Sequence, residues 1–131
     1  MRVFVTGVAG QLGYDVMKEL ARRGHTGTGS DLAATSEFED YRPLDITDGA
    51  AVERVLSDVR PDAVVHCAAW TAVDDAEEED KREPVAKINV DGTQNVANAC
   101  KRLGCKMLYV STDYVFDGQG TTPWTPDCKS Y

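Results

Sequence analysis

The sequence lacks the features that mark several special classes of protein. No apolar run approaches the ~18 residues that a membrane span requires, so we expect no membrane association. The 131 residues begin with Met-Arg-Val-Phe-Val, which is typical of a strand and not of a signal peptide, and we expect a cytoplasmic protein. Basic residues are few: 14 Lys and Arg against 22 Asp and Glu give a formal net charge of −8, which argues against nucleic acid as a partner.

Cysteine and histidine are also scarce, and they form no metal-binding pattern. The four cysteines contain no Cys-x-x-Cys pair and the sequence has only two histidines, so we expect no metal site. Free thiols are the default without export, and Cys67 and Cys100 are interpreted as small buried hydrophobic residues. The acidic run at residues 74–80 is interpreted as a solvated segment, with a divalent-cation site as the alternative.

Short apolar runs alternate with helical patterns along the chain. Strands are predicted at residues 2–6, 25–30, 44–46, 62–67 and 106–111, with helices at 10–23, from a cap at Thr47 or Asp48, and from Pro84 to Leu103. This alternation predicts right-handed βαβ units and a parallel sheet. The fold class is therefore α/β, a Rossmann-like doubly wound parallel sheet of about five strands within one domain.

The pattern fades after Ser111, because residues 112–131 contain turn signals and neither a strand nor a helix pattern. We therefore expect a truncated sheet whose C-terminal part is absent. An open edge at the last strand favours pairing with another chain, which makes a homo-oligomer a possible state.

A glycine-rich loop follows the first predicted strand. Gly7, Gly10 and Gly13 have the spacing G-x-x-G-x-x-G between that strand and the first helix. The first glycine allows a tight turn, the second a close approach of a pyrophosphate, and the third close packing of the helix on the strand. The N–H groups and dipole of the helix N-terminus favour negative charge there. The loop predicts dinucleotide binding, with a purely structural turn as the alternative.

Asp31 lies at the end of the second predicted strand, 24 residues after Gly7. A carboxylate at this position accepts hydrogen bonds from the adenosine ribose and repels a 2′-phosphate. We therefore expect NADH to be preferred, with NADPH possible because Arg42 is available to bind a 2′-phosphate. The alternative is that Asp31 only begins a turn.

Two further strand ends carry candidate residues. Asp45 and Ile46 are placed beside the adenine, although Asp45 is equally compatible with a helix-entry role. The fourth strand ends at His66 and is followed by Cys67-Ala68-Ala69, small residues that leave room for a ligand at the carboxyl edge of the sheet. His66 itself is interpreted as a core or supporting histidine.

Four motifs together resemble the extended short-chain dehydrogenase/reductases, and among them the dTDP-4-dehydrorhamnose reductase family. The motifs are the glycine spacing, the run from His66 through A-A-W-T-A-V-D at 68–74, N-V-D-G-T at 89–93, and S-T-D-Y-V-F-D-G at 111–118. The resemblance covers the whole chain. It implies reduction of the 4-keto group of a nucleotide-linked 6-deoxysugar, dTDP-4-dehydro-L-rhamnose, by NAD(P)H.

The resemblance also implies roles for individual residues. Thr112 matches the residue that hydrogen-bonds the substrate carbonyl, and Tyr114 matches a residue close to the sugar. Asn89 matches the asparagine that organises the active site, with a simple side-chain-to-backbone bond as the alternative. The cofactor-binding positions implied are Gly7, Gly10, Gln11, Leu12, Gly13, Asp31, Asp45, Ile46, Ala68, Ala69, Thr71 and Asn89.

One family element is missing after the last predicted strand. The family places a Tyr-x-x-x-Lys pair on the next helix, whose tyrosine protonates the substrate. Tyr109 and Tyr114 have Asp113 and Gly118 four residues on, and Tyr131 is the last residue. We therefore expect these residues to bind the cofactor without catalysing the reaction. The alternatives are a non-catalytic regulatory subunit, like the methionine adenosyltransferase beta subunit, and a sugar-nucleotide epimerase or dehydratase.

Overall fold

A five-stranded, all-parallel sheet forms the centre of the molecule, and the computed structural model describes residues 1–130 except for the side chain at position 75. The strands lie in the order β3-β2-β1-β4-β5. They are β1 (Arg2–Thr6), β2 (Thr26–Asp31), β3 (Tyr41–Pro43), β4 (Ala63–His66) and β5 (Lys106–Tyr109). The Rossmann-like α/β fold predicted from the sequence is confirmed. Because the chain turns to opposite sides of β1 before and after β3, the carboxyl ends of β1 and β4 form the switch point of the sheet.

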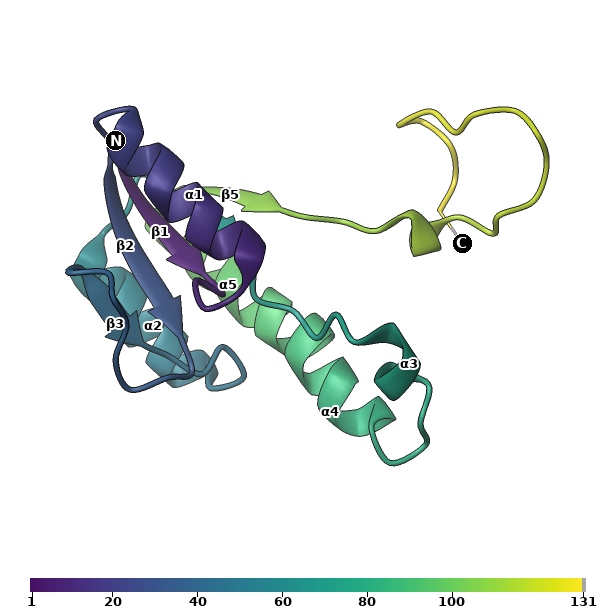
Figure 1. The fold of residues 1–131 in the computed structure, drawn as a ribbon, viewed down its shortest axis with the longest axis horizontal. Helices are drawn as coiled ribbons and strands as arrows, with labels where there is room; N and C mark the ends of the chain where they lie inside the picture. The colour runs from purple at the N-terminus through teal and green to yellow at the C-terminus, as the bar shows by residue number, and fades with distance from the viewer. Residues whose placement is uncertain (131) are drawn as a thin grey trace.

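Helices cover both faces of the sheet (Figure 1). On one face, α1 (Gln11–Arg22) packs Met17 against Val3, Val5 and Val8. On the other face, α2 (Gly49–Val59) and α5 (Thr93–Leu103) enclose Phe4. The two cores alternate along β1 because successive side chains of a strand point to opposite faces.

The third strand does not lie where the sequence analysis placed it. β3 is formed by residues 41–43, which pair with Gly29–Asp31 of β2, whereas the predicted residues 44–46 follow the strand as a loop. Leu44 and Ile46 are buried in the core from that loop. Their hydrophobicity therefore comes from core packing and not from a strand, and Asp45 lies beyond the strand end.

The helix predicted from Pro84 to Leu103 is interrupted by a π-helical segment. A short helix α3 (Val73–Ala76) precedes α4 (Arg82–Ala86), the π segment η1 (Lys87–Gly92) and α5. The backbone of Gly92 lies so close to Ile46 that a Cβ there would stand 2.7 Å from Ile46 Cδ1. π segments of this kind occur often at functional sites.

The chain leaves the sheet after β5 (Figure 1). The last strand ends at Tyr109, two residues earlier than predicted, and a 3₁₀ turn η2 (Asp113–Val115) follows. Phe116 and Trp124 stack there with ring centroids 4.8 Å apart. Tyr131 lies outside the described residues, among which no helix is both long and apolar enough to span a membrane.

Candidate functional site

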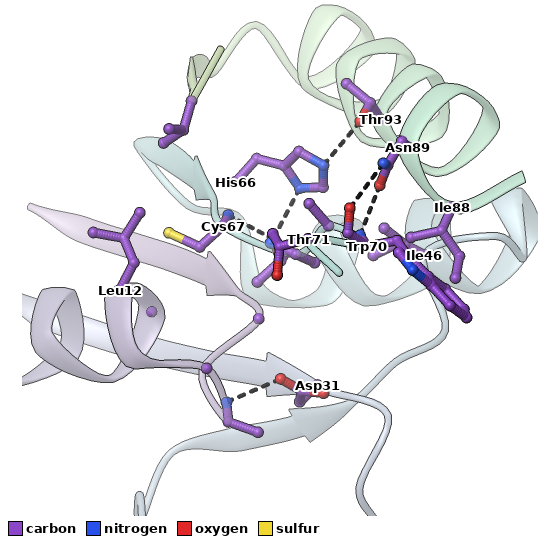
Figure 2. Close-up of a pocket in the computed structure, with 18 of the residues that line it drawn as sticks. Leu12, Asp31, Ile46, His66, Cys67, Trp70, Thr71, Ile88, Asn89 and Thr93 are labelled. Carbon is purple, nitrogen blue, oxygen red and sulfur yellow. Dashed lines mark hydrogen bonds between the residues drawn. The ribbon is translucent and has the colours of Figure 1, made fainter. Parts of the chain in front are cut away.

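A cleft of about 1410 Å³ opens at the carboxyl edge of the sheet, above the switch point between β1 and β4. Every residue predicted for the site lines this cleft. Figure 2 shows Leu12, Asp31, Ile46, Thr71 and Asn89 among the residues around it. The residues come from the loop after β1, the ends of β2 and β3, the segment after β4, η1 and the segment after β5. The structure therefore brings together residues that are up to about a hundred positions apart in the sequence.

The loop after β1 is held by backbone hydrogen bonds. The N–H groups of Gly7 and Val8 both donate to the Ser30 carbonyl, at 2.8 and 3.2 Å, which anchors the loop on β2. Gly10 is the N-cap of α1, and because it has no side chain, no side-chain hydrogen bond caps the helix. The first turn of α1 contains no acidic residue, and the positive end of the helix dipole lies at the cleft.

The three glycines of this loop have different structural roles. A Cβ on Gly7 would stand 2.6 Å from Ala68 N, and one on Gly13 would stand 2.2 Å from Gly7 O. Gly7 also has φ +73°, a conformation that L-residues rarely adopt. At Gly10 the nearest protein atom would be 3.4 Å away, an ordinary contact. The fold itself therefore requires Gly7 and Gly13, whereas the protein leaves the space beside Gly10 open to a ligand.

Asp31 uses its carboxylate to hold the loop. Its Oδ2 accepts a hydrogen bond from Ala9 N at 2.9 Å, and its Oδ1 accepts one from Leu32 N at 2.8 Å (Figure 2). The nearby Arg42 forms an ion pair with Asp40, with 3.1 Å between Nη1 and Oδ1. The one carboxylate thus connects the end of β2 with the glycine loop, while the guanidinium of Arg42 is held by another partner.

The two residues after β3 are fixed differently from each other. Asp45 Oδ1 accepts hydrogen bonds from the backbone N–H and the hydroxyl of Thr47, both at 2.8 Å, as expected of a turn that enters a helix. Asp48 is the N-cap of α2 and accepts from Ala51 N at 3.0 Å. Ile46 is buried in the core. Asp45 is exposed at the cleft, whereas Ile46 forms part of its apolar floor.

A buried polar chain crosses the floor of the cleft. Thr6 Oγ1 accepts hydrogen bonds from the backbone N–H groups of Cys67 and Ala68, both at 3.2 Å. A hydroxyl has only two lone pairs, so its proton is left for His66 Nδ1, which is 2.8 Å away. His66 therefore carries its proton on Nε2 and donates to Thr93 Oγ1 at 3.1 Å.

His66 is only 2% exposed, and burial lowers its pKa below the usual value because the charged form is desolvated. Its ring stacks on Tyr109 with centroids 6.1 Å apart. These contacts give His66 the supporting role expected of it. A neutral histidine joins β1, β4 and α5 and fixes the backbone of residues 67 and 68.

Asn89 binds the backbone of the segment after β4. Its Oδ1 accepts from Trp70 N at 2.7 Å, and its Nδ2 donates to Trp70 O at 3.1 Å (Figure 2). Both polar groups of this amide are thus satisfied by the backbone N–H and C=O of the single residue Trp70. The side-chain-to-backbone bond that the sequence analysis considered for Asn89 is present, and it orders the stretch that contains Ala68, Ala69 and Thr71.

Thr112 and Tyr114 lie on the side of the cleft that follows β5. Thr112 Oγ1 accepts from Tyr114 N at 3.2 Å, a contact within the 3₁₀ turn, and Tyr114 is 73% exposed.

A Tyr-x-x-x-Lys spacing occurs once in the sequence, at Tyr14 and Lys18 of α1, where Lys18 Nζ lies 5.8 Å from the Tyr14 ring centroid. Neither residue lines the cleft, so this pair does not replace the family's pair.

Two residues that shape the site, Thr6 and Thr93, were not among the predicted site residues. Thr6 ends the apolar run of the first strand and Thr93 ends the N-V-D-G-T motif, and nothing in the sequence pairs either of them with His66. Among the described residues that line the cleft, Lys87 is the one lysine or arginine, against three aspartates. Negative charge on a ligand is therefore met chiefly by backbone N–H groups. No cluster of three potential metal ligands occurs in the described part of the chain.

Comparisons with known proteins extend these observations. The sequence model of the family described as RmlD substrate binding domain matches residues 1–130. A dTDP-4-dehydrorhamnose reductase of Streptomyces griseus is 43% identical over 126 residues, which are 96% of this chain and 38% of that protein. The methionine adenosyltransferase 2 subunit beta of Pongo abelii is 35% identical over 118 residues, 89% of this chain and 34% of that protein. The chain thus spans little more than a third of these relatives.

Solved structures with the same fold include a dTDP-4-dehydrorhamnose reductase from Clostridium acetobutylicum, with TM-score 0.85, 34% identity and coverage of 100% of this chain and 43% of that one. The Bacillus anthracis dTDP-4-dehydrorhamnose reductase in complex with NADP has a TM-score of 0.78 and 39% identity, and the match covers 91% of this chain and 39% of that one. The Thermus thermophilus UDP-glucose 4-epimerase in complex with NAD has a TM-score of 0.79 and 31% identity, and the match covers 99% of this chain and 45% of that one.

Proposed function

The chain belongs to the RmlD substrate binding domain family, and from this premise we propose that residues 1–131 are the NAD(P)-binding domain of a sugar-nucleotide reductase. The substrate we propose is dTDP-4-dehydro-L-rhamnose, whose 4-keto group is reduced to give dTDP-L-rhamnose. The observation that carries the proposal is the glycine loop at the switch point of a parallel sheet, with space for a ligand beside Gly10. Relatives that are named as this reductase support it.

The residues of the cleft fit a dinucleotide. The N–H groups at the start of α1 and the open space beside Gly10 suit the pyrophosphate. Asp31 and Asp45 offer carboxylates to the ribose and the adenine, and Ile46 offers an apolar surface. Ala68 and Ala69 line the cleft with small side chains, so the backbone there would allow the nicotinamide ring to come close.

The reaction places a different demand on the residues after β5. When bound, the reduced nicotinamide supplies a hydride to the C4 carbonyl carbon of the sugar. The Thr112 hydroxyl donates a hydrogen bond to the carbonyl oxygen, where negative charge develops. Tyr114 contacts the sugar. The proton for that oxygen requires a Tyr-x-x-x-Lys pair after β5, which Tyr109, Tyr114 and Tyr131 do not provide within these residues.

We further propose that NADH is preferred over NADPH. A 2′-phosphate on the adenosine ribose would approach the Asp31 carboxylate, and like charges repel. The cation that would offset this repulsion, Arg42, is bound to Asp40 and to the Tyr41 carbonyl. The related Bacillus anthracis reductase is in complex with NADP, so that protein accepts the phosphorylated cofactor. The proposed preference is therefore a difference in affinity and not an exclusion.

A second candidate function is a non-catalytic binding subunit, which the 35% identity to a methionine adenosyltransferase beta subunit favours. A third is a sugar-nucleotide epimerase, because a UDP-glucose 4-epimerase with NAD shares the fold at 31% identity. An epimerase keeps its cofactor bound through turnover. NAD⁺ that copurifies with the protein at one equivalent would therefore favour the epimerase over the reductase.

The experiment that tests the proposal is a calorimetric titration of the chain with NADH and, in parallel, with NADPH. We expect binding of both, with NADH tighter by roughly tenfold. The same chain mixed with NADH and dTDP-4-dehydro-L-rhamnose should show no loss of NADH absorbance. A folded chain that binds neither dinucleotide would refute the assignment of the cleft, and steady oxidation of NADH would refute the expected lack of catalysis.

Variants of Asp31 separate charge from loop support. Asp31→Asn removes the negative charge and keeps an oxygen that accepts from Ala9 N or Leu32 N. Asp31→Ala removes the acceptor as well. We expect both variants to shift the ratio of affinities toward NADPH by about tenfold, and the alanine variant to weaken both cofactors further because the loop loses its support. An unchanged ratio in both variants would show that Asp31 does not contact the ribose.

A further inference from the structure

Two cysteines meet at the carboxyl end of α5, on the side of the molecule away from the cleft lining. Cys105 N donates to Cys100 O at 3.1 Å, and Gly104 N donates to Lys101 O at 3.3 Å. Gly104 has φ +67°, which completes a Schellman motif. In this motif the side chain three residues before the last helical residue, here Leu103, contacts the side chain two residues after it. Here both of these positions are cysteine.

The surroundings of the two thiols differ in a way that matters for reactivity. Cys100 is 3% exposed and belongs to the core beside Val96 and Ala99, whereas Cys105 packs against the same core and is partly exposed. Burial and the neighbouring Cys105 thiol raise the pKa of Cys100 to about 12. Each thiol therefore has the other as its polar neighbour, and Cys105 is the one that a reagent in solution reaches.

We propose that Cys100 and Cys105 form a reversible dithiol–disulfide pair that links the end of α5 to the start of β5. The oxidant is a small-molecule disulfide such as oxidised glutathione. The Cys105 thiolate attacks one sulfur of this disulfide, breaks its S–S bond and releases one glutathione thiolate. Cys100 then loses its proton to solvent, attacks the Cys105 sulfur and releases the second glutathione thiolate. Two protein thiols are oxidised and one glutathione disulfide is reduced.

The position of the pair gives the bond a structural consequence. Cys105 directly precedes β5, and Tyr109 at the other end of this strand stacks on His66 beneath the cleft. The bond closes a short ring at the junction of helix and strand. It restricts the unfolded chain more than the folded one, because the folded backbone already holds residues 100 and 105 together.

Peptide mapping tests the proposal, because trypsin cleaves between the two cysteines at Lys101 and Arg102. The chain is incubated with oxidised glutathione at pH 8.5, free thiols are alkylated, and the digest is analysed without reduction. We expect peptide 88–101 joined to peptide 103–106, at the sum of their masses less two hydrogens, and its loss after dithiothreitol treatment. Alkylation of both cysteines, or a stable glutathione adduct on Cys105 with Cys100 free, would overturn the proposal.

Two cysteine variants show whether the joined peptides depend on Cys105. Cys105→Ser should abolish the joined peptides while the chain stays folded, because residue 105 is only partly buried. Cys128→Ser is the matched control and should leave their yield unchanged. The oxidised chain should melt roughly 5 °C higher than the reduced chain. A lower melting temperature would show that the native backbone does not accommodate the bond.

Discussion

The two sides of the cleft are built by different means. The loop from Gly7 to Gly13 is anchored on β2 by two backbone hydrogen bonds and on Asp31 by a third, and its glycines fit against neighbouring backbone atoms. On the other side, residues 110–130 leave the sheet, and Thr112 and Tyr114 contact each other within one turn. The difference teaches that the side proposed for the cofactor is defined by the packing of the sheet itself, whereas the side proposed for the substrate is defined only by local contacts.

The largest effect should come from a methyl group at Gly7. Gly7→Ala places a Cβ 2.6 Å from Ala68 N at a positive φ, and we expect the free energy of unfolding to fall by about 4 kcal/mol or more. Gly118→Ala is the matched control, since Gly118 has φ +68° and no neighbour within 4 Å. It should lose only about 1–2 kcal/mol. Equal losses in urea unfolding would mean that the close fit of the loop contributes nothing.

The next effect separates binding from folding at the loop. Gly10→Val should weaken NADH binding by at least about 100-fold, equivalent to about 2.7 kcal/mol, because the side chain occupies the space for the pyrophosphate. The stability of the chain should fall by only about 1 kcal/mol, since Gly10 has an ordinary φ of −83° and room for a Cβ. Titration and urea unfolding of the same sample measure both quantities. Unchanged affinity would contradict the role of the loop.

A smaller effect should come from the pH dependence of the cleft floor. Burial lowers the pKa of His66 in the folded chain, so the unfolded chain takes up its proton first as the pH falls below about 6.5. The stabilisation that neutral His66 contributes is complete above that pH and is lost below it, by at most about 1.4 kcal/mol per pH unit. Its ring faces the uncharged groups Thr6, Thr93 and Tyr109. Urea unfolding between pH 7 and 5 should show this slope in the native chain and a flatter one in His66→Gln.

The smallest effect should come from the substrate side. Thr112→Val and Tyr114→Phe remove hydroxyl groups from exposed residues outside the core, and we expect changes in stability below about 0.5 kcal/mol. NADH affinity should also stay within about twofold. Thermal unfolding and titration measure both. A loss as large as that of Gly7→Ala would show that residues after β5 support the fold and would remove the contrast between the two sides.

The sequence predicted those elements whose signals are local. The glycine spacing and the apolar runs of β1 and β4 place the loop and its sheet, because a buried parallel strand needs a continuous run of apolar residues. The end of α5 was predicted at Leu103, and the next residue, Gly104, has a φ of +67°, a conformation that favours glycine. The residues predicted for the cleft all line it because the carboxyl ends of parallel strands share one edge.

The remaining features depend on contacts across the fold. Leu44 and Ile46 were interpreted as a strand, although their burial comes from a loop, while β3 at residues 41–43 depends on pairing with β2. The π segment forms where Gly92 meets Ile46, and no periodicity within one helix encodes that contact. The hydrogen bond that Ala9 N donates to Asp31 likewise joins the glycine loop to the end of β2. Each of these features requires knowledge of which residues are neighbours in space.

The most direct test of the account is hydrogen–deuterium exchange of the chain with and without NADH, read peptide by peptide. We predict slower exchange in the presence of NADH at residues 7–13, 30–32 and 67–71, and unchanged exchange at residues 110–130. Protection that appears only after β5, or nowhere despite a saturating concentration of NADH, would contradict the proposal that the glycine loop and the ends of β2 and β4 bind the cofactor.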